Sequence, residues 1–222
     1  MALQIPNLRL QYTFGGLLPS TDTTAIEYQH FIENFGTEGN VLLIGADARD
    51  LRSPEGLQAW YELAESIRFM DTRRDTVDDG IDKLVPLSLI DSVFSITHSF
   101  SLEKDTALRR FALMPLVDPG AMEVGGAVDS TFVQNLFDQV ESLPFYEGLL
   151  FTKRGDATLL TVFLDADLFN SKKRGTVVED MVALTDLWSE KHGIDLAISG
   201  LPFIRTEMTN KVKGEIGWFI GA

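Results

Sequence analysis

Two aspartates, Asp165 and Asp167, directly follow an apolar segment, and their spacing is the strongest sign of catalysis in the sequence. In aspartyl phosphotransferases, the first of two such residues attacks phosphorus and the second acts as a general acid. That chemistry also needs a hydroxyl donor, a lysine and further carboxylates for Mg²⁺ downstream, and we expect only one strand and two helices after Asp167. We therefore interpret the pair as a polar strand end, where Asp167 or Asn170 turns the chain.

Metal sites are not indicated either. The acidic run Asp78, Asp79 and Asp82 lacks the alternating oxygen ligands, terminal glutamate and central glycine of an EF-hand loop, so we expect a solvated loop. None of the three histidines has a second histidine or a glutamate at zinc-site spacing; these are His30, His98 and His192. The chain has no cysteine, which removes disulfides, cysteine zinc sites and thiol nucleophiles.

Nucleotide sites and serine nucleophiles are equally unsupported. The glycine pairs at 15–16 and 125–126 match neither a phosphate loop nor a dinucleotide fingerprint, because no strand leads through them into a helix. Ser95 and Ser199 lack the glycines of a nucleophile elbow. We therefore assign no catalytic, cofactor-binding or metal-ligating residue, and we expect a protein that is not an enzyme and needs no cofactor.

Length and charge limit the remaining classes of function. The chain has 222 residues, of which 45% are hydrophobic, so it can bury a core of ordinary size. Its 19 Lys and Arg stand against 33 Asp and Glu, a formal net charge of −14 that disfavours nucleic acid as a partner. No run reaches the roughly 20 apolar residues that span a bilayer, and the start does not have the pattern of a signal peptide.

Apolar periodicity and punctuation predict alternating strands and helices. Capping boxes formed by Thr24 with Glu27 and by Thr176 with Glu179 start two of the helices, and Ser53 followed by Pro54 starts another. The expected helices are 24–35, 53–67, 131–144, 176–193 and a last one beyond Pro202. The expected strands are 41–44, 91–97 and 194–198, with a hairpin whose arms 149–152 and 158–164 flank a turn at 153–156.

This order indicates an α+β protein. Two right-handed βαβ-like halves sharing one mixed sheet, as in a ferredoxin-like fold, account for it economically. A doubly wound parallel sheet is less compatible, because the hairpin at 153–156 requires an antiparallel pair. We expect a single domain over 1–222, an irregular excursion at about 99–130, and Trp60 and Trp188 buried on the same face of the sheet.

Several segments carry a resemblance to a known family. They are residues 12–22 (YTFGGLLPSTD), the strand at 92–97, the hairpin at 149–164, and 200–208 running into 217–219. In order, and over nearly the whole chain, they resemble the first large extracytoplasmic loop of resistance-nodulation-division (RND) superfamily exporters. The closest likeness is to bacterial predicted exporters of the MMPL or sterol-sensing-like branch. The resemblance implies an RND porter-like fold.

The resemblance also implies a setting. A transmembrane helix would precede Ala2 and another would begin near Ile216, which would explain the apolar residues Ile216, Trp218, Phe219 and Ile220. The parent protein would lie in a bacterial inner membrane, with this segment on the periplasmic side. Its partners would be the transmembrane helices and a second extracytoplasmic loop of the same transporter, and apolar or amphiphilic small molecules or lipids. A homo-oligomer is left open. The proton-coupling carboxylates would lie outside this chain, so no residue is carried over from the family.

Two other classes stay open beside the exporter: a free-standing ligand-binding or adaptor domain, and an aspartyl phosphotransferase that uses Asp165. The middle of the chain is rich in aromatic residues and methionine. In a cargo route some of these side chains would line a groove, because Phe and Met give adaptable apolar contact, whereas core packing is the simpler interpretation. The residues are Phe94, Phe100, Phe111, Met114 and Met122.

Overall fold

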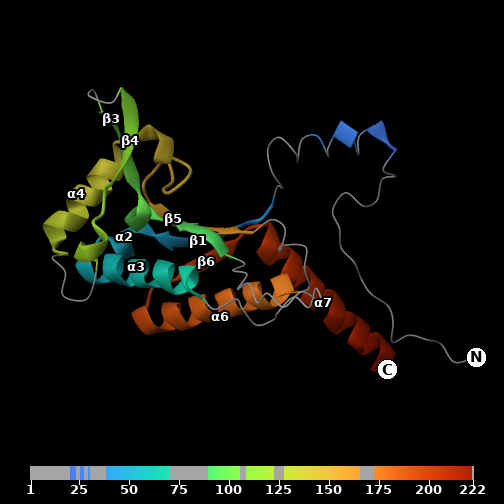
Figure 1. Ribbon diagram of the computed structural model, residues 1–222. Helices are drawn as coiled ribbons and strands as arrows, with labels where there is room; N and C mark the ends of the chain where they lie inside the picture. Colours follow the sequence, from blue (N-terminus) through green and yellow to red (C-terminus); the bar gives the residue numbers. More distant parts are fainter. Residues whose placement is uncertain are drawn as a thin grey trace, which may run out of the picture. The chain divides into compact units, whose positions relative to one another are not determined.

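The computed structural model describes residues 21–23, 26–27, 30, 39–70, 90–105, 109–122, 128–165 and 173–221 (Figure 1). The chain groups into two compact units, Met1–Glu38 and Gly39–Ala222, and each is considered by itself. The expected helix at 24–35 lies mostly outside the described residues, as do the acidic loop with Asp78, Asp79 and Asp82, and the turn with Asp167 and Asn170. The fold that follows is that of the second unit.

A four-stranded sheet forms the centre of this unit, which makes the protein α+β. Its strands are β1 (Val41–Asp47), β2 (Ile90–Phe94), β5 (Ala157–Leu164) and β6 (Leu196–Ser199), in the order β2-β5-β1-β6. The four expected strand regions therefore share one layer. Every neighbouring pair is antiparallel, so the expected mixed sheet is wrong. The connection from β1 to β2 skips one position in the sheet, which β5 fills. The connection from β5 to β6 also skips one position, which β1 fills, and each intervening strand is antiparallel to its neighbours.

Strand β1 alternates between two environments. Leu42 and Ile44 are fully buried, whereas Val41, Leu43 and Gly45 are partly exposed. They lie opposite Val162 and Leu160 of β5, which are also fully buried, so the cross-strand pairs form the floor of the core. A continuous apolar run such as 41–44 is typical of a strand buried on both faces. Instead, one face is fully buried and the other is partly covered.

Two helices, α3 (Pro54–Arg68) and α6 (Lys173–His192), pack side by side against the sheet (Figure 1). The Ser53 hydroxyl accepts a hydrogen bond from the Gly56 amide at 3.0 Å, which confirms the expected cap of α3. Trp60 and Trp188 are buried with their rings edge to face, and the centroids are 6.1 Å apart. The Trp188 indole donates to the Ala59 carbonyl at 2.9 Å, so the expected burial of both indoles is confirmed.

The other long helices lie where the sequence predicts helices, although some of their ends differ from the expected ones. Helix α6 begins at Lys173, so Thr176 lies inside it and the expected capping box is wrong, whereas Gly193 ends it with φ +66° as expected. The others are α2 (Ala48–Leu51), α4 (Ser130–Glu141) capped by Asp129, and α7 (Leu201–Gly221). No helix among the residues that the structure describes is both long and apolar enough to cross a membrane.

The segment expected as an irregular excursion at 99–130 contains regular structure in its first half. Strands β3 (Phe100–Asp105) and β4 (Arg110–Pro115) form an antiparallel hairpin that projects from the body of the unit (Figure 1). The expected hairpin at 149–164 is confirmed at its turn, where Gly155 has φ +65° and its amide bonds to the Thr152 carbonyl. Its first arm is no strand: Phe151 makes isolated bridges with Thr158 and Glu147.

Gly200 allows β6 to approach β1, so a side chain at this position should destabilise the protein. The residue has φ +116°, and a Cβ there would lie 2.4 Å from the Val41 carbonyl oxygen. We expect Gly200→Ala to lower the free energy of unfolding by about 2–4 kcal/mol, because backbone strain and a backbone clash add. Gly214→Ala is the matched control, since a Cβ there meets nothing within 4 Å and Gly214 lies in helix α7. Urea unfolding should show the control at least as stable as the parent; equal losses would contradict the account.

Candidate functional site

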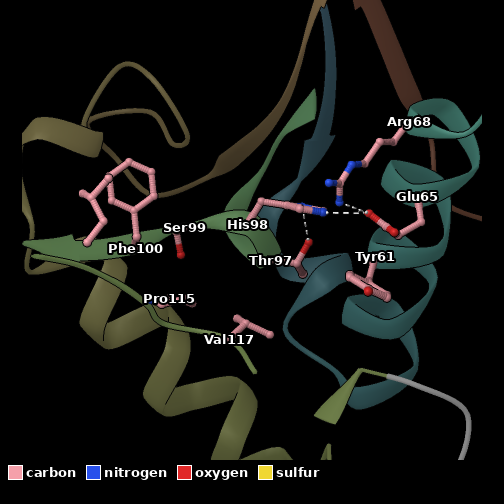
Figure 2. Close-up of a pocket in the computed structure, with 10 residues that line it drawn as sticks. Tyr61, Glu65, Arg68, Thr97, His98, Ser99, Phe100, Pro115 and Val117 are labelled. Atoms are coloured by element: carbon pink, nitrogen blue, oxygen red, sulfur yellow. Dashed lines mark hydrogen bonds and ion pairs between the residues drawn. The ribbon is translucent and has the colours of Figure 1, made fainter. Parts of the chain in front are cut away.

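A pocket of about 350 Å³ lies where the β3–β4 hairpin meets helix α3 (Figure 2). Helix α3 contributes one wall, the turn between β2 and β3 contributes the floor, and the start of β3 and the end of β4 contribute the opposite wall. The lining residues are Tyr61, Glu65, Arg68, Thr97, His98, Ser99, Phe100, Leu113, Pro115 and Val117. The pocket is therefore polar toward α3 and apolar toward the hairpin.

His98 is the centre of the polar side. Its Nε2 lies 3.1 Å from Glu65 Oε1, and its Nδ1 lies 2.9 Å from the Ser95 hydroxyl and 3.1 Å from the Thr97 hydroxyl. The imidazole stacks on the Tyr61 ring with centroids 5.7 Å apart and planes 19° apart. Figure 2 shows the imidazole reaching from its turn toward Glu65 on α3. One side chain thus ties the floor of the pocket to its helical wall.

Local backbone structure aims His98 at the helix. After β2 the chain makes a single 3₁₀ turn, Ile96–His98, in which the His98 amide bonds to the Ser95 carbonyl at 2.9 Å. The buried hydroxyls at this turn are satisfied, since Ser95 and Thr97 bond to each other at 2.8 Å and Ser99 bonds to the Ile96 carbonyl. The strand expected at 91–97 therefore ends earlier, at Phe94, and a polar turn takes the place of its last residues.

A hydroxyl, an imidazole and a carboxylate in contact are also the groups of a hydrolytic triad. Ser95, however, is fully buried and is not among the lining residues, so its oxygen does not face the pocket. Thr97 lines the pocket but is only 4% exposed. This geometry gives a hydrogen-bonded imidazole that faces a cavity, rather than a nucleophile presented to a substrate.

The apolar side of the pocket continues outward along one face of the hairpin. Cross-strand pairing places Phe100 opposite Pro115, Leu102 opposite Leu113 and Lys104 opposite Phe111. Since side chains two residues apart share a face, these six residues form one face, which we call the hairpin face. Leu102, Phe111 and Leu113 are 55%, 65% and 60% exposed. Apart from Lys104 near its outer end, the hairpin face is therefore an apolar surface that begins inside the pocket and ends in solvent.

Tyr146 anchors the base of the hairpin. Its hydroxyl accepts from the Phe100 amide at 2.8 Å and donates to the Phe100 carbonyl at 2.7 Å. Its ring also packs against Phe94 and Phe100, with centroids 5.9 and 6.3 Å away. Burial raises the pKa of the Tyr146 phenol, so it remains a donor at neutral pH. The hairpin thus leaves the core from a fixed point.

The expected groove residues separate into three groups. Phe111 and Met114 are exposed, Phe94 and Phe100 are half-buried in the aromatic cluster, and Met122 is fully buried in the core. Of these five, only Phe100 is a lining residue of the pocket, and Phe111 extends the same face. Core packing therefore accounts for Met122, and binding of cargo by the other four residues stays a hypothesis.

Other residues singled out in the sequence do not gather here. Asp165 follows β5 and is not a lining residue, and the His192 ring packs on the Trp188 ring at a 35° tilt with centroids 4.8 Å apart. No group of three or more potential metal ligands occurs in the described part of the chain. Sequence spacing addresses His98 only as a possible zinc ligand and does not reveal its contact with Glu65. Its partner Glu65 lies 33 residues earlier and on another element, so no local spacing could have joined the two.

Comparison of the chain with protein-family models, curated proteins and solved structures gives no match.

Proposed function

We propose that this chain is an extracytoplasmic, porter-like domain of an RND superfamily exporter, in which the pocket and the hairpin face bind apolar or amphiphilic cargo. The observation that carries the proposal is the continuity between a pocket with a polar end and an exposed apolar face. An amphiphile could place its head group near Glu65, Arg68 and His98 and its apolar part along the hairpin face.

The exposure of the hairpin face supports a binding role. Three large apolar side chains more than half exposed on one short hairpin are costly unless something covers them at times, and such patches mark interaction surfaces. The surface is open and the contacts are mostly apolar, which suits varied ligands and weak binding. An exporter must release what it holds, so tolerance and modest affinity are the properties it needs.

The topology supports the porter-like part of the proposal. Two β-α-β halves, β1-α3-β2 and β5-α6-β6, interleave their strands in one antiparallel sheet. That arrangement is the one expected of a ferredoxin-like fold, which the RND resemblance implies. The β3–β4 hairpin and α4 are inserted between the two halves, in the connection from β2 to β5.

Helix α7 supports the membrane setting. It packs against α6 and β1 near its start and continues beyond α6 (Figure 1). Its sequence becomes apolar at the end, with Ile216, Trp218, Phe219 and Ile220 inside the helix. A helix whose apolar content increases toward its end is suited to continue into a bilayer. The proton-driven step of export would take place in the membrane part, and no residue of this chain is assigned to it.

A binding assay tests the cargo site. N-phenyl-1-naphthylamine, an uncharged apolar dye, should bind the parent with micromolar or weaker affinity. Leu113→Ser should weaken binding about three- to tenfold, because the ligand loses apolar contact on the hairpin face. Met114→Ser is the matched control, since Met114 is 46% exposed on the opposite face of the same strand. Leu187→Ser, at an exposed site on α6, is a second control.

Thermal unfolding separates binding from folding in this series. Leu113 and Met114 are both exposed, so neither variant should lower Tm by more than about 2 °C. Equal loss of dye binding in the Leu113 and Met114 variants, or a loss that follows Tm, would contradict a site on the hairpin face.

The membrane setting has its own test. We expect the parent gene to encode stretches of about 20 apolar residues immediately before residue 2 and from about residue 216 onward, because the exporter needs a helix on each side. Sequencing the flanks of the gene checks this. Polar flanks would remove the exporter and leave a free-standing ligand-binding domain that uses the same pocket.

A further inference from the structure

The polar end of the pocket carries a charge that depends on one side chain. Glu65 Oε1 lies 3.3 Å from Arg68 Nη1 and 3.1 Å from His98 Nε2. With a neutral imidazole, the carboxylate and the guanidinium balance to zero; with a protonated imidazole, the three groups sum to +1. Glu65 and Arg68 on α3 and His98 on the floor are the charged or titratable lining residues apart from the Tyr61 phenol, and the hairpin wall contributes none.

The surrounding hydroxyls accommodate both protonation states. When Nδ1 is unprotonated, it can accept from the Ser95 or the Thr97 hydroxyl; when it is protonated, it can donate to either oxygen. The 2.8 Å contact between these hydroxyls lets them exchange donor and acceptor roles by rotation of their hydrogens alone. Nε2–H can donate to Glu65 in either state. Protonation therefore changes the charge of the pocket without requiring any heavy atom to move.

We propose that His98 is a protonation switch that sets the head-group preference of this pocket, so that anionic amphiphiles bind more tightly when His98 is protonated. The inference rests on the proposed cargo site and adds its selectivity. The His98 side chain is 17% exposed, so it exchanges protons with solvent while facing the ligand. Arg68 keeps its charge throughout the range in which an imidazole titrates. Histidine is the side chain whose ordinary titration range lies near neutral pH, and His98 is the histidine that lines this pocket.

Two dyes with the same aromatic frame test the switch. 8-Anilinonaphthalene-1-sulfonate carries a permanently charged sulfonate, and N-phenyl-1-naphthylamine lacks it. We expect the sulfonate dye to bind the parent about three- to tenfold more tightly at pH 5.5 than at pH 8, the change expected for one added charge in a partly exposed pocket. The uncharged dye should change less than twofold. The ratio of the two affinities then isolates the head-group effect.

Variants assign the effect to His98. His98→Gln keeps a hydrogen-bonding side chain but cannot charge, so the affinity ratio should become independent of pH. Glu65→Gln leaves Arg68 unbalanced and should raise the affinity for the sulfonate dye at pH 8 several-fold, which tests the same electrostatics without replacing the imidazole. His192→Gln is the matched control, because His192 packs on Trp188 and is not a lining residue. It should keep the pH dependence of the parent.

The outcomes distinguish the switch from the site that it acts on. If both dyes bind but their affinity ratio is flat with pH in the parent, or if His98→Gln keeps the full pH dependence, the switch is wrong and the cargo site stands. If the uncharged dye does not bind at all, the proposed function fails and the switch fails with it. If the His98→Gln variant unfolds, the Glu65→Gln result decides: no gain for the sulfonate dye at pH 8 overturns the proposal.

Discussion

The antiparallel pairing of β1 with β5 is the interaction on which the rest of the second unit depends. It extends over all seven residues of β1, from Val41 opposite Phe163 to Asp47 opposite Ala157. The same strand pairs with β6 on its other side. Because β1 belongs to one β-α-β half and β5 to the other, this pairing joins the halves into one sheet. Helices α3 and α6 are thereby brought together, and the Trp60–Trp188 contact fills the space between them.

The site follows from that arrangement. Once α3 lies against the sheet, its last turns pass the point where β2 ends, and Glu65 meets His98 there. The hairpin leaves from the same place, held by the two hydrogen bonds of Tyr146 to Phe100. A two-stranded hairpin is marginal by itself, so its order depends on this anchored base. The anchored base thus presents an apolar surface to solvent, and exposed apolar patches of this kind mark interaction surfaces.

Features that depend on local chemistry could be predicted from the sequence. The cap at Ser53, the left-handed glycines at 155 and 193 and the buried indoles each follow from a short stretch of chain. Features that depend on distant partners could not. To predict the all-antiparallel order, one must know which strand fills each skipped position in the sheet. Strands β3 and β4 lack the clear alternation of a half-buried strand, because β4 is exposed on both faces. The contact of His98 with Glu65 exists only after α3 has packed on the sheet.

The proposed function depends on the binding of apolar ligands to the hairpin face next to His98. The most direct measurement is a methyl NMR titration of the protein with N-phenyl-1-naphthylamine, followed through assigned leucine methyl groups. The account predicts ring-current shifts at Leu102 and Leu113, on the hairpin face, with the exposed Leu187 on α6 unchanged. Shifts at Leu187 with none at Leu102 and Leu113, or shifts confined to core leucines such as Leu63, would contradict it.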